Sequence, residues 1–263
     1  MKALNKLYIY PFSNIIFTGD VMKKGLYLIL NQKHFIYIFF SLFFFVVIAV
    51  GYAAEKTVSA SATAASNPII VIDAGHGGED GGTQSASGIL EKDINLSISK
   101  KLNNILKDDG FNTVMIREDD RLIYDENLST MRSKKSSDIH NRFSIMKKYP
   151  DCVFISIHQN YFTESKYSGA QVFYRPDHGE SRSLAQNIQE SIVNLIQKEN
   201  TRQIKSCTSS VYLIYNAPVT AVMVECGFLS NAQEAERLSD ENYQNDIALA
   251  ISNGLKNYLQ LRK

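Results

Sequence analysis

Short runs of β-branched residues alternate with longer amphipathic segments from Pro68 to the end of the chain, and this alternation strongly limits the fold. Strands are expected at residues 68–73, 112–116, 153–158, 169–174, 211–214 and 221–225, and helices at 91–106, 137–148, 180–198, 231–238 and 242–259. Such alternation is typical of α/β proteins. We therefore predict a single α/β domain over residues 68–263, with a mostly parallel or mixed twisted sheet flanked by helices on both faces.

The elements at the start of this domain have the clearest patterns. The run Ile69–Ile72 ends in Asp73 and a glycine-rich loop, as a buried strand of an open sheet would. The helix expected from Glu91 carries apolar residues on one face, at Ile94, Ile98, Leu102, Ile105 and Leu106. Sites in such sheets form beyond the carboxyl ends of the strands. This rule draws attention to residues 73–82, 158–160 and 225–231.

An uncharged run of twenty residues, Phe35–Ala54, precedes the domain. It is long enough to cross a bilayer as a helix. Lysines on its amino-terminal side predict that residues 1–34 are cytoplasmic and that the rest of the chain is outside. The small residues at the end of the run also fit a signal-peptidase site. A retained membrane anchor and a cleaved signal peptide both stay open, and either predicts an exported, extracytoplasmic protein.

Two further features concern the segments around this run. Met22, followed by Lys23 and Lys24, is a more natural start for an export signal than Met1. Residues 55–67 are mostly small and polar and cannot bury enough apolar surface to fold, so they are expected to form a linker.

Charge and cysteine content exclude some classes of protein. The formal net charge is +1, without a local run of basic residues, so we expect no nucleic-acid partner. The three cysteines are an odd number, which argues against a disulfide framework. Cys152 and Cys226 lie in apolar strand-like runs and are expected to be buried, free thiols.

Four residues at the ends of predicted elements could carry chemistry. His76 follows the first strand among glycines, Glu91 begins the first helix, and His158 ends a central strand. Two imidazoles and one carboxylate are a ligand set for zinc with a water molecule in the fourth position. Glu225 ends another apolar strand, where a carboxylate is costly to bury unless it has a partner. It could exchange a proton with that water.

Other interpretations of these residues are weaker. The glycine-rich stretch GHGGEDGG matches neither the dinucleotide-binding nor the P-loop pattern, and no G-x-S-x-G nucleophile motif occurs. Cys226 has no indicated histidine partner. The remaining histidines, His34, His140 and His178, are expected to be solvated.

Four ordered motifs resemble those of the zinc-dependent N-acetylmuramoyl-L-alanine amidases of the amidase-3 family. The motifs are DAGHGG at 73–78, LEKD at 90–93, ISIHQN at 155–160 and VECGFLSN at 224–231. The resemblance covers about Pro68–Leu259. It implies that His76, Glu91 and His158 bind one zinc ion per chain and that Glu225 is the catalytic carboxylate. The implied reaction is hydrolysis of the amide between N-acetylmuramic acid and L-alanine in peptidoglycan.

Within that family the chain is similar to the spore-cortex amidases of the CwlD type. Supporting segments are GILEKD at 88–93, residues 132–142, SGAQ at 168–171 and residues 201–202. This likeness implies a place at the forespore envelope, formation of muramic-δ-lactam with a downstream muramic acid deacetylase, and a role in germination. Some relatives act with a lipoprotein partner. A division or autolytic amidase, another zinc hydrolase of the wall, and a non-catalytic peptidoglycan-binding protein of the same fold remain alternatives.

The chain departs from the family at Ala74, where relatives usually have proline, and this change could loosen the loop that carries His76. Arg132, Arg142 and Arg202 could contact substrate, although ordinary solvated or ion-paired roles are commoner for arginines.

Overall fold

The computed structural model describes residues 36–49 and 67–261. The chain divides into two compact units, residues 1–66 and 67–263, which are considered separately. In the first unit residues 36–49 form a helix. None of the helices in the two described stretches combines the length and apolarity needed to cross a membrane. The expected cytoplasmic segment, start at Met22, cleavage site and linker lie almost wholly outside the described residues and stay predictions.

The second unit is built on one six-stranded mixed sheet with the order β2-β1-β3-β6-β4-β5. The pairs β2-β1, β1-β3 and β3-β6 are parallel. Strand β4 runs antiparallel to β6 and parallel to β5. The predicted single α/β domain with a mixed sheet is therefore confirmed. The strands are β1 Ile70–Ala74, β2 Thr113–Met115, β3 Val153–Asn160, β4 Gln171–Tyr174, β5 Lys205–Ser206 and β6 Thr220–Phe228.

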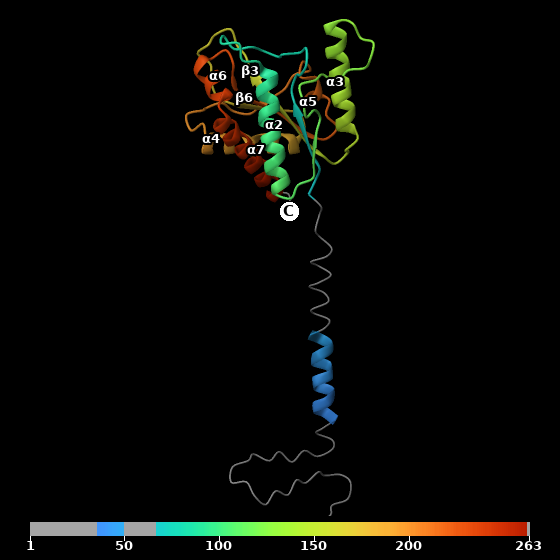
Figure 1. Cartoon of the computed structure of the whole chain (residues 1–263). Coiled ribbons are helices and arrows are strands. Elements are labelled where there is room, and N and C mark those ends of the chain that lie inside the picture. The colour runs from blue at the N-terminus through green and yellow to red at the C-terminus, as the bar shows by residue number, and fades with distance from the viewer. Residues whose placement is uncertain (1–35, 50–66, 262–263) are drawn as a thin grey trace, which may run out of the picture. The chain divides into compact units, whose positions relative to one another are not determined.

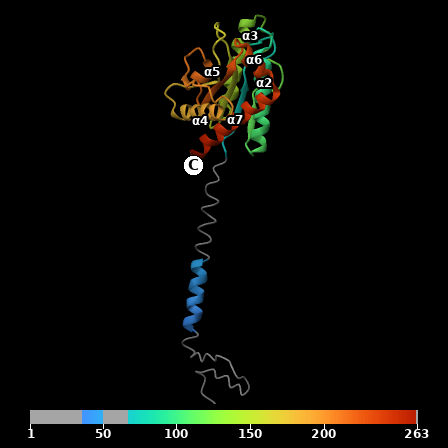
Figure 2. The same ribbon diagram turned by 90° about the vertical axis from the view of Figure 1, so that its left-hand side faces the viewer.

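Helices cover both faces of this sheet because strand side chains alternate between two apolar clusters. Ile70, Ile155 and Val224 belong to a cluster with α2 (Glu91–Asp108), α4 (Gly179–Leu195), α6 (Ala232–Ser239) and α7 (Glu241–Leu261). Helix α7 lies between α2 and α4 (Figures 1 and 2). Val71 and Phe154 point the other way, toward α3 (Met131–Lys147) and α5 (Tyr212–Tyr215). The strand interior is thus buried on both sides and mostly apolar, and the residues proposed as functional lie toward the carboxyl ends of the strands.

The strand predicted at residues 211–214 is wrong, because Tyr212–Tyr215 forms the short helix α5. The amide of Tyr215 donates to the carbonyl of Val211, and Leu213 and Ile214 are buried in the second cluster. Four apolar residues in a row have no period that separates a buried helical turn from a buried strand.

Helix α3 and strand β5 also differ from the sequence prediction. Helix α3 begins at Met131 and not at 137, because Thr130 caps it by accepting a hydrogen bond from the amide of Ser133. The two-residue strand β5 was not predicted. Its exposed residues lie at the edge of the sheet, where no burial pattern marks a strand.

Candidate metal centre

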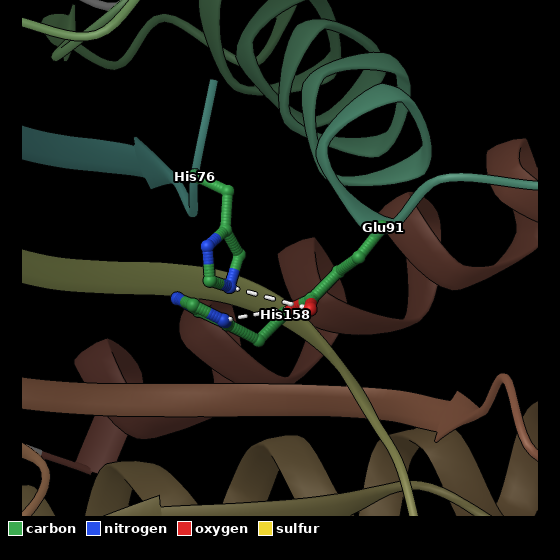
Figure 3. A group of neighbouring side chains, drawn as sticks. All are labelled: His76, Glu91 and His158. Carbon is green, nitrogen blue, oxygen red and sulfur yellow. Dashed lines mark hydrogen bonds and ion pairs between the residues drawn. The ribbon is translucent and has the colours of Figure 1, made fainter. Parts of the chain in front are cut away.

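Three side chains converge beyond the carboxyl ends of β1 and β3 (Figure 3). His76 lies just after β1, Glu91 is the first residue of α2, and His158 lies near the end of β3. One potential ligand atom from each lies within 4.8 Å of the other two. The structure therefore brings together the three residues that the sequence analysis predicts as metal ligands.

Both imidazoles turn one nitrogen toward the carboxylate of Glu91. The Nε2 atom of His76 is 3.3 Å from Oε2 of Glu91, and Nδ1 of His158 is 2.9 Å from Oε1. The other nitrogen of His76, Nδ1, lies 2.8 Å from Oδ2 of Asp80. A carboxylate bound to the outer nitrogen is the usual way in which proteins orient a metal-binding histidine. This leaves Nε2 of His76 and Nδ1 of His158 as the inward-facing donors.

Two glycines make room for these side chains. A Cβ atom on Gly75 would lie only 2.2 Å from Nε2 of His158, and one on Gly82 would lie 2.5 Å from Oε2 of Glu91. Gly82 also has a φ of +70°, a backbone conformation that favours glycine. The glycine-rich loop thus serves for close approach of the site's side chains and not as a phosphate cradle.

Backbone amides and a lysine hold the carboxylates in place. The amide of Thr83 donates to Oε2 of Glu91 at 2.9 Å, and the amide of Gln159 donates to Oε1 at 3.1 Å. Lys135 lies 2.6 Å from the second oxygen of Asp80. Glu91 is only 2% exposed, so its orientation is set by these contacts rather than by solvent.

The charges of the site favour a cation at its centre. Burial opposes the charged form of His76, but hydrogen bonds to Asp80 and Glu91 outweigh burial and raise its pKa to about 9. Burial also opposes ionisation of Glu91, yet hydrogen bonds to His158 and His76 hold its pKa below the ordinary value. The buried carboxylate is therefore negative and draws positive charge toward the inward-facing nitrogens. A divalent cation can satisfy the same demand in place of protons.

Two buried arginines support the loop that carries His76. Arg142 lies 2.6 Å from Asp73 and donates to the carbonyls of Ala74 and His76, at 2.8 and 2.7 Å. Arg117 donates to the carbonyls of Ala74 and Gly75, at 2.8 and 3.0 Å. Sequence reasoning missed Arg117, although a basic residue directly after an apolar strand was a usable signal. Arg142 is ion-paired with Asp73, which is one of the ordinary roles that the sequence analysis expected to be commoner than substrate contact.

Glu225 lies beside the three converging side chains. Strands β3 and β6 pair His158 with Glu225, so that both side chains lie on the same face of the sheet. Its Oε2 atom is inaccessible to solvent and has no hydrogen-bond partner among the described residues. Burial, opposed by the charges of His158 and His76, raises the pKa of Glu225 to about 7. A carboxyl group with such a pKa can accept and return a proton near neutral pH.

The other candidate residues have structural positions. His140 is exposed on α3, and the side chain of His178 caps α4 by accepting a hydrogen bond from Ser181. Cys152, Cys207 and Cys226 are buried, free thiols, as predicted for Cys152 and Cys226. Arg132 is exposed on α3, and Arg202 is partly buried near the end of β6.

An α/β sheet with two imidazoles and a carboxylate converging at its carboxyl edge defines a candidate metal-dependent enzyme. The family model of N-acetylmuramoyl-L-alanine amidases, Amidase_3, matches residues 70–257. The chain therefore belongs to this amidase family.

Individual relatives agree with this assignment. The germination-specific N-acetylmuramoyl-L-alanine amidase of Bacillus subtilis is 33% identical over 193 residues, which are 73% of this chain and 80% of that protein. The CwlD amidase from Clostridioides difficile, whose structure is in complex with the GerS lipoprotein, is 41% identical. That match covers 74% of this chain and 100% of the other, with a TM-score of 0.72. AmiC2 of Nostoc punctiforme is 28% identical, with coverages of 73% and 97% and a TM-score of 0.62.

Substituting Gly75→Ala tests the packing of the candidate ligands. The added methyl group would overlap the ring of His158, so we expect the affinity for a divalent metal ion to fall by about tenfold or more, as for other changes that disturb the surroundings of a metal site. Gly81→Ala is the matched control, because its Cβ would meet only the flexible end of Leu90 at 3.3 Å. Zinc titration against a competing chelator measures both. Equal affinities of the two variants would contradict this account of the site.

Proposed function

We propose that this chain is a zinc-dependent N-acetylmuramoyl-L-alanine amidase that removes stem peptides from peptidoglycan. The observation that carries the proposal is the convergence of His76, Glu91 and His158 beside Glu225, whose Oε2 atom has no partner among the described residues, in a chain of the amidase family. A protein that only bound peptidoglycan would have no need for a carboxylate with one buried, unpaired oxygen next to such a site, since this group is costly to keep.

Zinc fits the residues that are present. Two nitrogen donors and one carboxylate oxygen form a three-ligand set that leaves a fourth position free, as in catalytic zinc sites. We propose one zinc ion per chain, held by Nε2 of His76, Nδ1 of His158 and the carboxylate of Glu91. When bound, zinc supplies a Lewis acid for the amide carbonyl and lowers the pKa of the attacking water.

Glu225 then acts as general base and general acid. Its carboxylate takes a proton from the water that attacks the carbonyl carbon, and it returns that proton to the nitrogen of L-alanine as the amide bond breaks. The raised pKa of about 7 allows this carboxyl group both to accept the proton and to donate it near neutral pH. A nearby cation lowers the pKa of a carboxyl group, so the acid limb of the pH–rate profile is expected on the acid side of about pH 7.

Digestion of purified peptidoglycan tests the reaction. The zinc-loaded protein is expected to release whole stem peptides and leave muramic acid with free lactyl carboxylates. Glu225→Gln is expected to bind zinc normally but to lose about 10²–10⁴-fold in rate, because it cannot accept the proton. Mass spectrometry identifies the fragments, and metal analysis serves as the control.

Other outcomes of this digestion would contradict the proposal. Shortened peptides or lost acetyl groups would instead indicate a different wall hydrolase. A wild-type protein that binds peptidoglycan without cutting it would indicate a binding protein. Full activity in Glu225→Gln would remove Glu225 from the mechanism while leaving the zinc site intact.

We further propose that the substrate is spore-cortex peptidoglycan, outside the cytoplasm at the forespore envelope. The support is the likeness to a relative named a germination-specific amidase and to the CwlD amidase. In this setting the bare muramic acid would pass to a deacetylase that completes muramic-δ-lactam. A lipoprotein partner is proposed because the CwlD amidase structure is a complex with the GerS lipoprotein. We also propose that residues 35–54 either anchor the protein in the membrane or are cleaved as a signal peptide.

Complementation tests the spore-cortex role. The full chain is expressed during sporulation in a Bacillus subtilis strain that lacks its germination-specific amidase. We expect it to restore muramic-δ-lactam to the cortex and the Glu225→Gln variant to leave the cortex unchanged. Muropeptide analysis of the spores measures both. Normal activity on isolated peptidoglycan without any lactam in the cortex would favour a division or autolytic role.

A further inference from the structure

The carboxyl edge of the sheet continues beyond Glu225 into a groove that the proposed chemistry does not use. Strand β4 pairs Gln171 with Glu225, as β3 pairs His158 with Glu225. Paired residues on neighbouring strands point to the same face. His158, Glu225 and Gln171 therefore form a row across three strands, and Gln171 lies about 10 Å from His158 at the usual strand spacing.

The groove at the end of this row combines aromatic rings with two cationic side chains. It has a volume of about 370 Å³, and no acidic residue lines it. Phe162 and Tyr167 are 46% and 37% exposed, and their rings contact each other edge to face at 5.0 Å. Phe228 forms the floor and is 3% exposed. Arg202 and Lys205 also line the groove.

Neither cation has a carboxylate partner within the described part of the chain. The guanidinium of Arg202 lies over the Phe228 ring, 4.9 Å from its centroid, and donates to Oε1 of Gln171 at 2.5 Å. Its Nε atom is buried and has no hydrogen-bond partner among the described residues. Lys205 is exposed, with its Nζ 5.9 Å from the centre of the Phe173 ring. Burial lowers the pKa of Arg202, and the nearby charges of Glu234 and Glu225 oppose this change. The groove thus offers a partly balanced positive charge over an apolar floor.

We infer that this groove binds a free carboxylate of the stem peptide, with Arg202 as the main contact and Lys205 as the second. The inference rests on the proposed amidase function and adds a specificity-determining site to it. An extended peptide advances about 3.3–3.6 Å per residue, so a side-chain carboxylate on the second residue after the cut amide can reach Arg202. The aromatic rings would pack against the aliphatic part of the same peptide. The ligand class is therefore an acidic peptide joined to the muramic acid.

Two synthetic muramyl peptides test this inference with the zinc-loaded full chain. They differ only at the second residue of the peptide, which carries either a free carboxylate or a primary amide. We expect wild-type kcat/KM to be at least about tenfold higher for the carboxylate, as a charge-assisted hydrogen bond would provide. In Arg202→Gln the ratio of kcat/KM for the carboxylate substrate to kcat/KM for the amide substrate should fall toward one. We expect this change to come from a higher KM for the carboxylate substrate, with kcat unchanged. Arg202→Lys should restore part of the preference.

Arg182→Gln is the matched control, because it removes one positive charge from an exposed position on α4. It should keep the wild-type preference. If Arg202 only supports Gln171 and Phe228, Arg202→Gln would slow both substrates equally, and this result would overturn the inference. Equal wild-type rates on the two substrates would also overturn it while leaving the amidase function standing. If the wild type cut neither substrate, the proposed function and the subsite would fail together.

Discussion

The candidate site depends on two buried guanidinium groups that bind the backbone of one short loop. Arg117 and Arg142 are 1% and 2% exposed, and between them they donate to the carbonyls of Ala74, Gly75 and His76. A buried charge is costly unless it is paired and fully hydrogen-bonded. Burial and the charge of Arg142 lower the pKa of Arg117, while Asp73 and other carboxylates compensate. Removing either arginine would therefore release the loop and also leave buried groups without partners.

This support explains how distant residues reach one point. The loop leaves β1 in a strained left-handed turn at His76, with φ of 62°, and the arginines hold that turn against relaxation. Glu91 is presented by the first turn of α2, and His158 by β3, which pairs directly with β1. Ala74, where the family resemblance leads us to expect proline, is buried within β1 and has its carbonyl held by both arginines. Tertiary hydrogen bonds at this position can thus replace the stiffness of a proline ring.

Much of this architecture follows from periodicity, and the exceptions have physical causes. The apolar runs of β1, β3 and β6 and the apolar face of α2 predict buried elements, and their polar terminal residues predict the site at the carboxyl edge. The run 211–214 was misassigned because it is too short to show a period. Arg117 follows an apolar strand and Asp80 follows His76 by four residues, but neither position shows which groups the side chain contacts, since the turn of the loop sets those contacts. The groove around Arg202 combines residues from four separate segments, which no local pattern relates.

We propose that two imidazoles and one carboxylate bind a single zinc ion, and X-ray absorption spectroscopy of the zinc-loaded protein tests this proposal. We expect a first shell of nitrogen and oxygen only, at about 2.0–2.2 Å, with scattering from two imidazole rings. A zinc–sulfur distance of about 2.3 Å would instead place a cysteine in the first shell and would contradict the assignment.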